Sequence, residues 1–443
     1  MKRGFYTIMA AQFFSSLADN ALLIAAIALL FQLSGPAWMT PLLKFFFTIS
    51  YVVLAAFVGA FADAMQKGHV MFVTNTVKII GCLMMLCYER ITAFFFGLEL
   101  PRLPEYVTVL LAYGIVGLGA AAYSPAKYGI LTELLPPRQL VVANGWIEGL
   151  TVASIILGTV LGGALISPGV SALLLSIDVP RIDTGVDTPA EAAMLVIAFF
   201  YVVAAIFNLF IPDTGARYER QKANPVELIR DFSHCFITLW RDKLGQISLA
   251  VTTLFWGAGA TLQFIVLKWA DAHLGLGLDR GAVLQGVTAL GIALGAVLAA
   301  RLVPLRKSFN VLPVGVAMGL AVTAMILVSA MPLVYLLLIV VGAMAGFFVV
   351  PMNALLQHRG HVLLSAGHSI AVQNFNENIS ILVMLALYAA MLRADLHINI
   401  IIVIFGTFVA LTMLAVMRWH RGNQSKGDSL HLIGMERQAR HRH

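Results

Sequence analysis

The sequence predicts an all-α membrane protein, with twelve transmembrane helices arranged as two six-helix bundles. Its 443 residues are 60% hydrophobic and only 12% charged, which is about half the charged share of a typical soluble protein. Apolar runs that are long enough to cross a bilayer core of about 30 Å recur along nearly the whole chain. Alternating segments of about ten residues, which are typical of an outer-membrane β-barrel, do not occur.

The apolar runs define the expected spans. They cover residues 5–33, 41–62, 69–90, 105–131, 139–167, 189–211, 246–270, 281–302, 311–330, 332–357, 362–392 and 396–418. The first span follows directly on Lys2 and Arg3 and has no convincing cleavage site, so we expect a retained helix rather than a signal peptide. Cys82 and Cys87 share one span and Cys235 lies in a basic connection, which argues against a disulfide framework.

The Lys and Arg residues are distributed unevenly between the connections. With the amino terminus inside, the inner connections contain Lys67, Arg138, the basic run from Arg217 to Lys243 and the basic tail that begins at Arg418. The outer connections contain far fewer basic residues. Because an excess of Lys and Arg marks the cytoplasmic side of a membrane protein, we expect both termini in the cytoplasm. The same bias explains the net charge of +7 without a nucleic-acid partner.

A long inner connection divides the spans into six and six. The expected domains are an N-terminal bundle over residues 1–211, a cytoplasmic linker over 212–245, a C-terminal bundle over 246–418 and a cytoplasmic tail over 419–443.

Part of the linker has the pattern of an amphipathic helix. Asn224 can cap it, Pro225 suits its first position, and Glu227 stands where a capping box requires an acidic residue. The apolar residues that follow at helical spacing are Val226, Ile229, Phe232, Phe236 and Trp240. We expect a helix that lies on the inner membrane surface and tethers the two halves. The alternative is a solvated linker with some helical content.

The two halves of the chain resemble internal repeats. Four pairs of residues recur in matching spans, at a separation that stays between 226 and 230 residues. The pairs are Pro125 and Pro351, Lys127 and Asn353, Asn144 and Asn374, and Glu148 and Glu377. Spans interrupted by Gly or Pro at matching positions of two halves point to the binding site of a transporter.

Several charged residues lie inside the expected spans, where an ionised side chain is costly unless it has a partner or a wet cavity. Asp19 and Glu377 lie near the middle of their spans. Lys127 and Glu148 lie at similar depth on consecutive antiparallel spans, which Pro136 and Pro137 separate. The candidate substrate-binding or gating residues are Asp19, Asn20, Lys127, Glu148, Asn353, Asn374 and Glu377.

The alternative is that these charges form buried pairs that only hold the helices together. For Lys127 and Glu148 both interpretations stay open, and they are compatible. For Asp19 we favour a direct role in function, and for Lys78, midway along the third span, we favour the structural interpretation. Lys44 is close to the end of its span, so its ammonium group can reach the membrane interface.

The connection between the second and third spans contains Gly59, Asp63 and Lys67. It resembles the loop motif of the major facilitator superfamily, although its basic residues are displaced and Ala64 replaces one of them. Asp63 could cap a neighbouring helix and hold the two halves together on the inner side. The alternative is that these charges only determine on which side of the membrane the connection lies. That would explain Lys67 but not Asp63. We therefore expect a conformational latch at these residues.

Four strings carry a more specific resemblance. AQFFSSLADNALL (11–23), GAFAD (59–63), YSPAKYGIL (123–131) and ANGWIEG (143–149) are similar to the bacterial lysophospholipid transporters. That family is a branch of the major facilitator superfamily. The first half of the chain resembles the family closely, and the second half resembles it more by pattern.

The resemblance implies a flippase of the bacterial inner membrane that works by alternating access and needs no cofactor. It would move lysophosphatidylethanolamine and lysophosphatidylglycerol from the outer to the inner leaflet. A separate cytoplasmic acyltransferase–acyl-carrier-protein synthetase would then re-acylate them, because the chain contains no His-x4-Asp acyltransferase motif. The transporter itself is expected to be a monomer. A phosphate would lie near Lys127, and an ethanolamine near Asp19 or Glu148.

Two other functions remain open. One is a proton-coupled facilitator of drugs or small solutes, in which Asp19 or Glu377 carries the proton. The other is a polytopic membrane enzyme. Against an enzyme, the sequence has no phosphate-binding Gly-Lys-Ser/Thr loop, no clustered His motif and no nucleophile elbow.

Overall fold

The computed structural model describes residues 3–55, 57–58, 61–62, 65–97, 104–134, 137–176, 186–215, 224–363 and 366–427. Throughout these residues the regular secondary structure is helical. The chain forms two compact units. The N unit contains residues 1–223 and 270–286, and the C unit contains residues 224–269 and 287–443.

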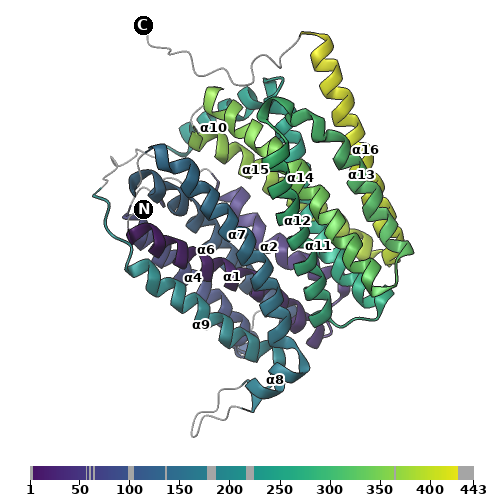
Figure 1. Ribbon diagram of the computed structural model, residues 1–443. Helices are drawn as coiled ribbons and strands as arrows, with labels where there is room; N and C mark the ends of the chain where they lie inside the picture. Colours follow the sequence, from purple (N-terminus) through teal and green to yellow (C-terminus); the bar gives the residue numbers. More distant parts are fainter. Residues whose placement is uncertain are drawn as a thin grey trace. The chain divides into compact units, whose positions relative to one another are not determined.

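The N unit is built from long helices that pack side by side (Figure 1). They are α1 (Arg3–Gln32), α2 (Thr40–Val53), α4 (Lys67–Leu86), α6 (Glu105–Leu134), α7 (Pro137–Ile166) and α9 (Pro189–Leu209). Shorter helices are α5 (Tyr88–Gly97), α8 (Pro168–Leu175) and a 3₁₀ turn, Ala37–Met39. A capping box begins α9, where the Thr188 hydroxyl accepts a hydrogen bond from the Glu191 backbone N–H and the Glu191 carboxylate accepts one from Thr188 N–H. Such a box supplies partners for backbone groups that a helix start leaves unsatisfied.

The C unit contains α10 (Pro225–Arg241), α13 (Leu312–Thr323), α14 (Met331–Leu363), α15 (Ala366–Arg393) and α16 (Ile398–Ser425). It also takes most of α11 (Gly245–Leu274) and α12 (Leu278–Leu302), whose residues 270–286 group with the N unit. Two 3₁₀ turns, Leu305–Val311 and Ala324–Leu327, flank α13.

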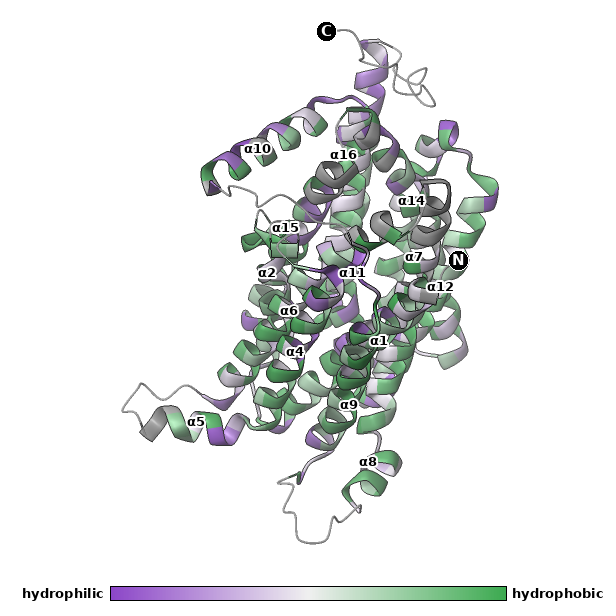
Figure 2. Cartoon of the chain, turned by 90° about the vertical axis from the view of Figure 1, so that its left-hand side faces the viewer, coloured by the Kyte–Doolittle hydropathy of each residue, from purple (hydrophilic) through white to green (hydrophobic). Residues whose placement is uncertain are grey.

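The predicted spans agree well with the observed helices, since each predicted range overlaps one of the long helices above. Among the described residues, ten helices are long and apolar enough to cross a membrane. The count becomes eleven if the last part of α7 and α8, which meet at a bend of 67°, form one span. Figure 2 shows the long helices as mainly hydrophobic. The all-α membrane class is therefore confirmed, whereas the predicted count of twelve is not reached on these criteria.

Two glycines allow the helices of the N unit to approach closely around the polar residues. A Cβ atom on Gly119 of α6 would lie 2.7 Å from the Thr74 carbonyl oxygen and 2.8 Å from Lys78 Cγ on α4. A Cβ atom on Gly158 of α7 would lie 2.5 Å from the Leu17 carbonyl oxygen and 2.9 Å from Asn20 Cβ on α1. Larger side chains would push these helices apart. Both glycines therefore help to set how closely α6 approaches α4 and how closely α7 approaches α1.

The predicted linker helix is present as α10. Asn224 caps it, because its side-chain oxygen accepts a hydrogen bond from the Val226 backbone N–H at 3.1 Å. Leu239 of α10 forms a core cluster of the C unit with Leu356 and Val372, and the aromatic side chains of α10 pack against this cluster. Hydrophilic and hydrophobic residues alternate along its surface (Figure 2).

Candidate functional site

A buried ion pair joins α1 and α4 inside the N unit. Lys78 Nζ lies 2.8 Å from Asp19 Oδ2, with 2% of the lysine side chain and 18% of the aspartate side chain exposed. The Tyr201 hydroxyl on α9 donates to the other carboxylate oxygen, Asp19 Oδ1, at 2.7 Å. Both oxygens of the carboxylate therefore have a protein partner.

The ion pair is part of a larger set of polar groups. Lys78 Nζ also donates to Ser15 Oγ at 2.9 Å, and Ser15 Oγ donates to Asn75 Oδ1 at 2.8 Å. The lysine ammonium lies 5.1 Å from the ring centroid of Tyr123 on α6, close enough for a cation–π interaction. We call Ser15, Asp19, Asn75, Lys78 and Tyr201 the N cluster. It links α1, α4 and α9, and it places a carboxylate inside the unit.

The sequence pattern favoured a functional role for Asp19 and a structural role for Lys78, whereas the structure joins the two residues in one ion pair. A signal for this was present in the sequence. Ser15 and Asp19 are four residues apart on α1, and Asn75 and Lys78 are three apart on α4, so each pair lies on one helix face. Nothing in the sequence indicated Tyr201, because it comes from a helix 182 positions further along the chain.

Asn20 lies on a different face of α1. Its side-chain amide donates to the Ser16 carbonyl of its own helix at 2.8 Å. The neighbouring surface is α7, where Gly158 leaves room for the Asn20 side chain.

The second predicted pair is only partly described. Lys127 is buried on α6, two residues after Pro125, which lies inside that helix. Glu148 belongs to α7, but its side chain lies outside the described residues. The predicted pairing of Lys127 with Glu148 therefore stays a prediction.

Of the three residues of the predicted latch, only Lys67 lies among the described residues. Gly59 and Asp63 lie outside the described residues. Lys67 is buried at the start of α4, and its ammonium group donates to the Ala62 carbonyl oxygen at 2.8 Å.

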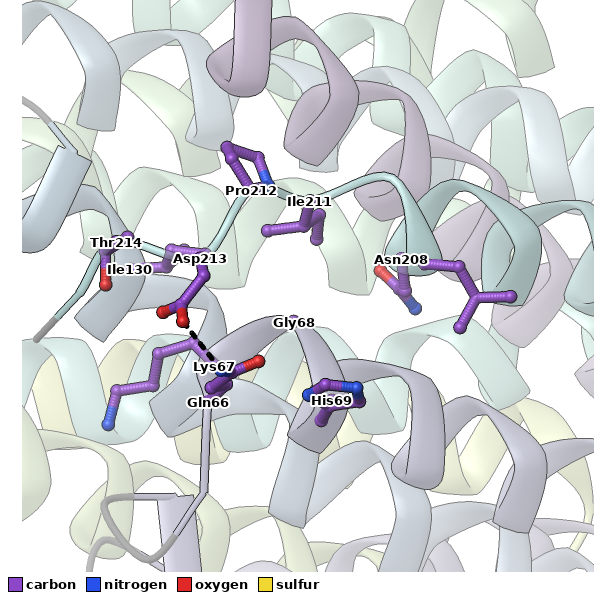
Figure 3. A pocket seen from close by; sticks show the side chains of 11 residues that line it. Gln66, Lys67, Gly68, His69, Ile130, Asn208, Ile211, Pro212, Asp213 and Thr214 are labelled. Atoms are coloured by element: carbon purple, nitrogen blue, oxygen red, sulfur yellow. Dashed lines mark hydrogen bonds between the residues drawn. The ribbon is translucent and has the colours of Figure 1, made fainter. Parts of the chain in front are cut away.

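A small pocket adjoins Lys67 within the N unit, where the segment that follows α9 meets the start of α4 (Figure 3). Gln66 Nε2 donates to Asp213 Oδ2 at 2.7 Å, and Asp213 Oδ1 accepts from the Gly215 backbone N–H at 3.0 Å. Deeper in the unit, Asn208 Nδ2 donates to the Met71 carbonyl at 3.0 Å. These bonds fasten the end of α9 to α4.

The C unit holds a second polar cluster, between α14 and α15. Gln373 Nε2 donates to Asn353 Oδ1 at 2.6 Å and to Glu377 Oε1 at 2.8 Å. Gln373 and Glu377 are each 7% exposed. We call Asn353, Gln373 and Glu377 the C cluster. Gln373 thus joins Asn353 and Glu377, which were both predicted as site residues, although Gln373 itself was not predicted.

Asn374 follows Gln373 on α15 and is half-buried. Its backbone carbonyl accepts a hydrogen bond from Asn378 Nδ2 at 2.7 Å. Pro351 lies inside α14, two residues before Asn353, as the repeat pattern predicted.

The two clusters supply carboxylates, an ammonium group and amides inside otherwise apolar units. Such groups can bind a polar or zwitterionic molecule in a membrane interior, where the apolar surroundings strengthen each electrostatic contact. Within the described residues, no group of three His, Cys, Asp or Glu side chains is arranged as a metal site would require.

Comparisons with known proteins identify the family. The family model of the Major Facilitator Superfamily matches residues 8–385. The lysophospholipid transporter LplT of Yersinia enterocolitica is 42% identical over 395 residues, which cover 89% of this chain and 88% of the relative. The protein of the same name from Yersinia pestis is 42% identical over 394 residues, with the same coverage of both chains.

Solved structures share the fold at low sequence identity. A bacterial homologue of the iron transporter ferroportin, in an inward-facing state, has a TM-score of 0.64 at 14% identity and covers 94% of this chain and 98% of its own. The POT family transporter PepTSo has a TM-score of 0.66 at 11% identity, with coverage of 96% and 99%. The chain belongs to the major facilitator superfamily and, within it, to the lysophospholipid transporter family.

Proposed function

We propose that this protein transports lysophospholipids, and that it moves lysophosphatidylethanolamine and lysophosphatidylglycerol from the outer to the inner leaflet of the bacterial inner membrane. The observation that carries this proposal is the 42% identity, over 89% of the chain, to proteins named as lysophospholipid transporters. The buried polar clusters support it, because a lipid headgroup crosses hydrocarbon slowly unless a protein provides polar partners.

In this proposal the chain has twelve spans in two bundles of six, with both termini in the cytoplasm. The ten long apolar helices, the bent pair of α7 and α8, and the shorter apolar helix around α2 together supply twelve candidates among the described residues. The bias of Lys and Arg toward the inner connections supports the orientation. The domain limits at residues 211, 245 and 418 belong to the same proposal.

The linker helix α10 would lie along the inner membrane surface. On α10, the apolar residues Val226, Ile229 and Ile237 are exposed, and so are Arg230 and Arg241. Apolar residues bordered by arginines suit the boundary between lipid tails and headgroups.

The headgroup would be bound by opposite charges on different helices. Its phosphate would engage Lys127. Its ethanolamine would approach Asp19 or Glu148, and Asp19 is the more accessible member of its ion pair. Asn20 would contribute from the next position of α1. Asn353, Asn374 and Glu377 would supply hydrogen bonds to glycerol and headgroup from the second half of the chain.

Transport would proceed by alternating access, in which the two halves rock about the substrate. Gly59, Asp63 and Lys67 would act as the latch between conformations. The chain would act as a monomer, and a separate cytoplasmic acyltransferase–acyl-carrier-protein synthetase would restore the missing acyl chain.

Uptake of labelled lysophosphatidylethanolamine into spheroplasts, with and without this protein, tests the proposal. We expect label to enter the inner leaflet only when the protein is present. Equal uptake in both preparations would contradict the proposal. Transport of a small solute that follows the proton gradient, without lysolipid uptake, would instead identify a proton-coupled facilitator.

A further inference from the structure

One turn of α15 has two different neighbours. Gln373 and Glu377 belong to the C cluster with Asn353 of α14. Val372, Phe375 and Asn376 of the same turn contact α10 instead.

The contact with α10 is both aromatic and polar. The Phe375 ring centroid lies 5.1 Å from that of Phe232 and 6.2 Å from that of Phe236. Trp240 Nε1 donates to Asn376 Oδ1 at 3.3 Å, and Asn376 Nδ2 donates to the Val372 carbonyl at 2.8 Å. Both polar atoms of the Asn376 amide therefore have a partner, one on α10 and one on α15 itself.

The end of α10 is bound to α14 by a second, charged contact. Arg359 Nη2 donates to Asp242 Oδ1 at 2.6 Å, and Arg359 Nε donates to Asp242 Oδ2 at 3.0 Å. Only 6% of the arginine side chain and 13% of the aspartate side chain are exposed. Asp242 Oδ2 also accepts a hydrogen bond from the Gly245 backbone N–H at 2.8 Å. Two parallel bonds between a guanidinium and a carboxylate hold both partners in one orientation.

Arg359 and Asn353 lie on the same part of α14, beyond Pro351. A proline inside a helix removes one backbone hydrogen bond and weakens the helix at that point. Arg359 follows Asn353 by six positions, which is about 9 Å along the helix axis. A displacement of Arg359 should therefore move Asn353 more than it moves the part of α14 that precedes Pro351.

We propose that α10 is a clamp on the substrate site of the C unit, and that Trp240 and Asp242 are its positioning residues. Asp242 holds the last part of α14, which carries Asn353, and Trp240 holds the turn of α15 that carries Gln373 and Glu377. Together they set the spacing across the C cluster and, through it, the affinity for a lysophospholipid headgroup. This inference rests on the proposed function.

The transport test uses Trp240→Phe, which keeps an aromatic ring but removes the donor to Asn376, and Asp242→Asn, which removes the charge that faces Arg359. We expect each variant to raise the half-saturating concentration of lysophosphatidylethanolamine about two- to tenfold, the factor that one hydrogen bond provides. The maximal uptake rate and the amount of protein in the membrane should stay close to those of the unmodified protein.

Trp419→Phe is the matched control, since Trp419 stacks on Trp240 with ring centroids 6.5 Å apart. Its half-saturating concentration should be unchanged. If Trp240→Phe, Asp242→Asn and Trp419→Phe all had the same half-saturating concentration, the proposed clamp would be overturned. A fall in maximal rate alone would also overturn it, because the clamp acts on affinity.

A second measurement does not depend on the proposed substrate. Spin labels at Ala354→Cys on α14 and Ile379→Cys on α15, in a chain whose Cys82, Cys87 and Cys235 are replaced by Ala, report the spacing of the two helices. We expect Trp240→Ala to shift or broaden the distance distribution, and Trp419→Phe to leave it unchanged. Unchanged spacing in Trp240→Ala would overturn the clamp even where lysolipid uptake is intact. Changed spacing in a protein without lysolipid uptake would contradict only the proposed function.

Discussion

The N cluster and the C cluster hold buried polar groups in different ways. In the N unit, full charges on α1 and α4 form an ion pair, and a tyrosine from α9 completes it. In the C unit, amides and one carboxylate on α14 and α15 share hydrogen bonds through Gln373. An ion pair with both ends bonded has a fixed geometry, whereas an amide can donate or accept and can exchange partners with a ligand. Changes in the N cluster should therefore act first on stability, and changes in the C cluster on affinity.

Breaking the ion pair from one side should have the largest effect. Lys78→Met leaves the Asp19 carboxylate without its cation, which we expect to lower the free energy of unfolding by about 3–5 kcal/mol. The double variant Asp19→Leu/Lys78→Met should recover most of this loss, because neither charge remains. Thermal unfolding of purified protein measures both. If the single and double variants unfold at the same temperature, the comparison between the clusters is wrong.

The same double variant separates stability from transport. Asp19 is proposed to approach the ethanolamine. Uptake of lysophosphatidylethanolamine should therefore be abolished in Asp19→Leu/Lys78→Met, even though this variant is folded. Full uptake by this variant would assign the N cluster to stability alone.

Removing the shared donor of the C cluster should have an intermediate effect. Gln373→Leu deprives Asn353 and Glu377 of the amide that joins them. We expect the half-saturating concentration for uptake to rise about tenfold, as for a lost hydrogen bond to a charged group. The melting temperature should change less than in Lys78→Met. Asn378→Ala is the control, since the Asn378 side chain bonds to its own helix. Equal effects of the two substitutions would remove the C cluster from the substrate site.

A smaller loss of stability than in Lys78→Met is expected where α4 and α6 approach each other. Gly119→Ala places a methyl group against the Thr74 carbonyl and Lys78 Cγ, which should cost about 1–3 kcal/mol of stability through overpacking. Gly169→Ala serves as the control, because a Cβ atom there would meet nothing within 4 Å. Unfolding curves of both variants test this. A neutral Gly119→Ala would mean that the spacing around Lys78 is looser than described.

The long helices could be predicted from the sequence because length and apolar character define a membrane span. Pro136 and Pro137 predicted a helix end that matches the end of α6 at Leu134 and the start of α7 at Pro137. The cap at Asn224 and the aromatic spacing that follows it predicted the linker helix α10. The helices α5 and α8 are absent from the prediction, since at ten and eight residues they are too short to give a span signal.

The partners of the buried groups were harder to predict. Asp19 meets Lys78 and Tyr201 through packing between helices far apart in the sequence, and periodicity cannot show which helices become neighbours. Gln373 stands among several polar residues of α15. Only the position of α10 on one side and α14 on the other decides that Gln373 faces Asn353 while Asn376 faces Trp240.

Movement of a fluorescent lysophosphatidylethanolamine between the leaflets of vesicles that contain only this purified protein tests the central claim most directly. The fraction of probe that albumin can extract reports the outer leaflet. We expect it to fall in vesicles with the protein, and to remain at the level of empty vesicles with Lys127→Ala, which removes the proposed phosphate partner. An unchanged extractable fraction with the folded, unmodified protein would contradict the account.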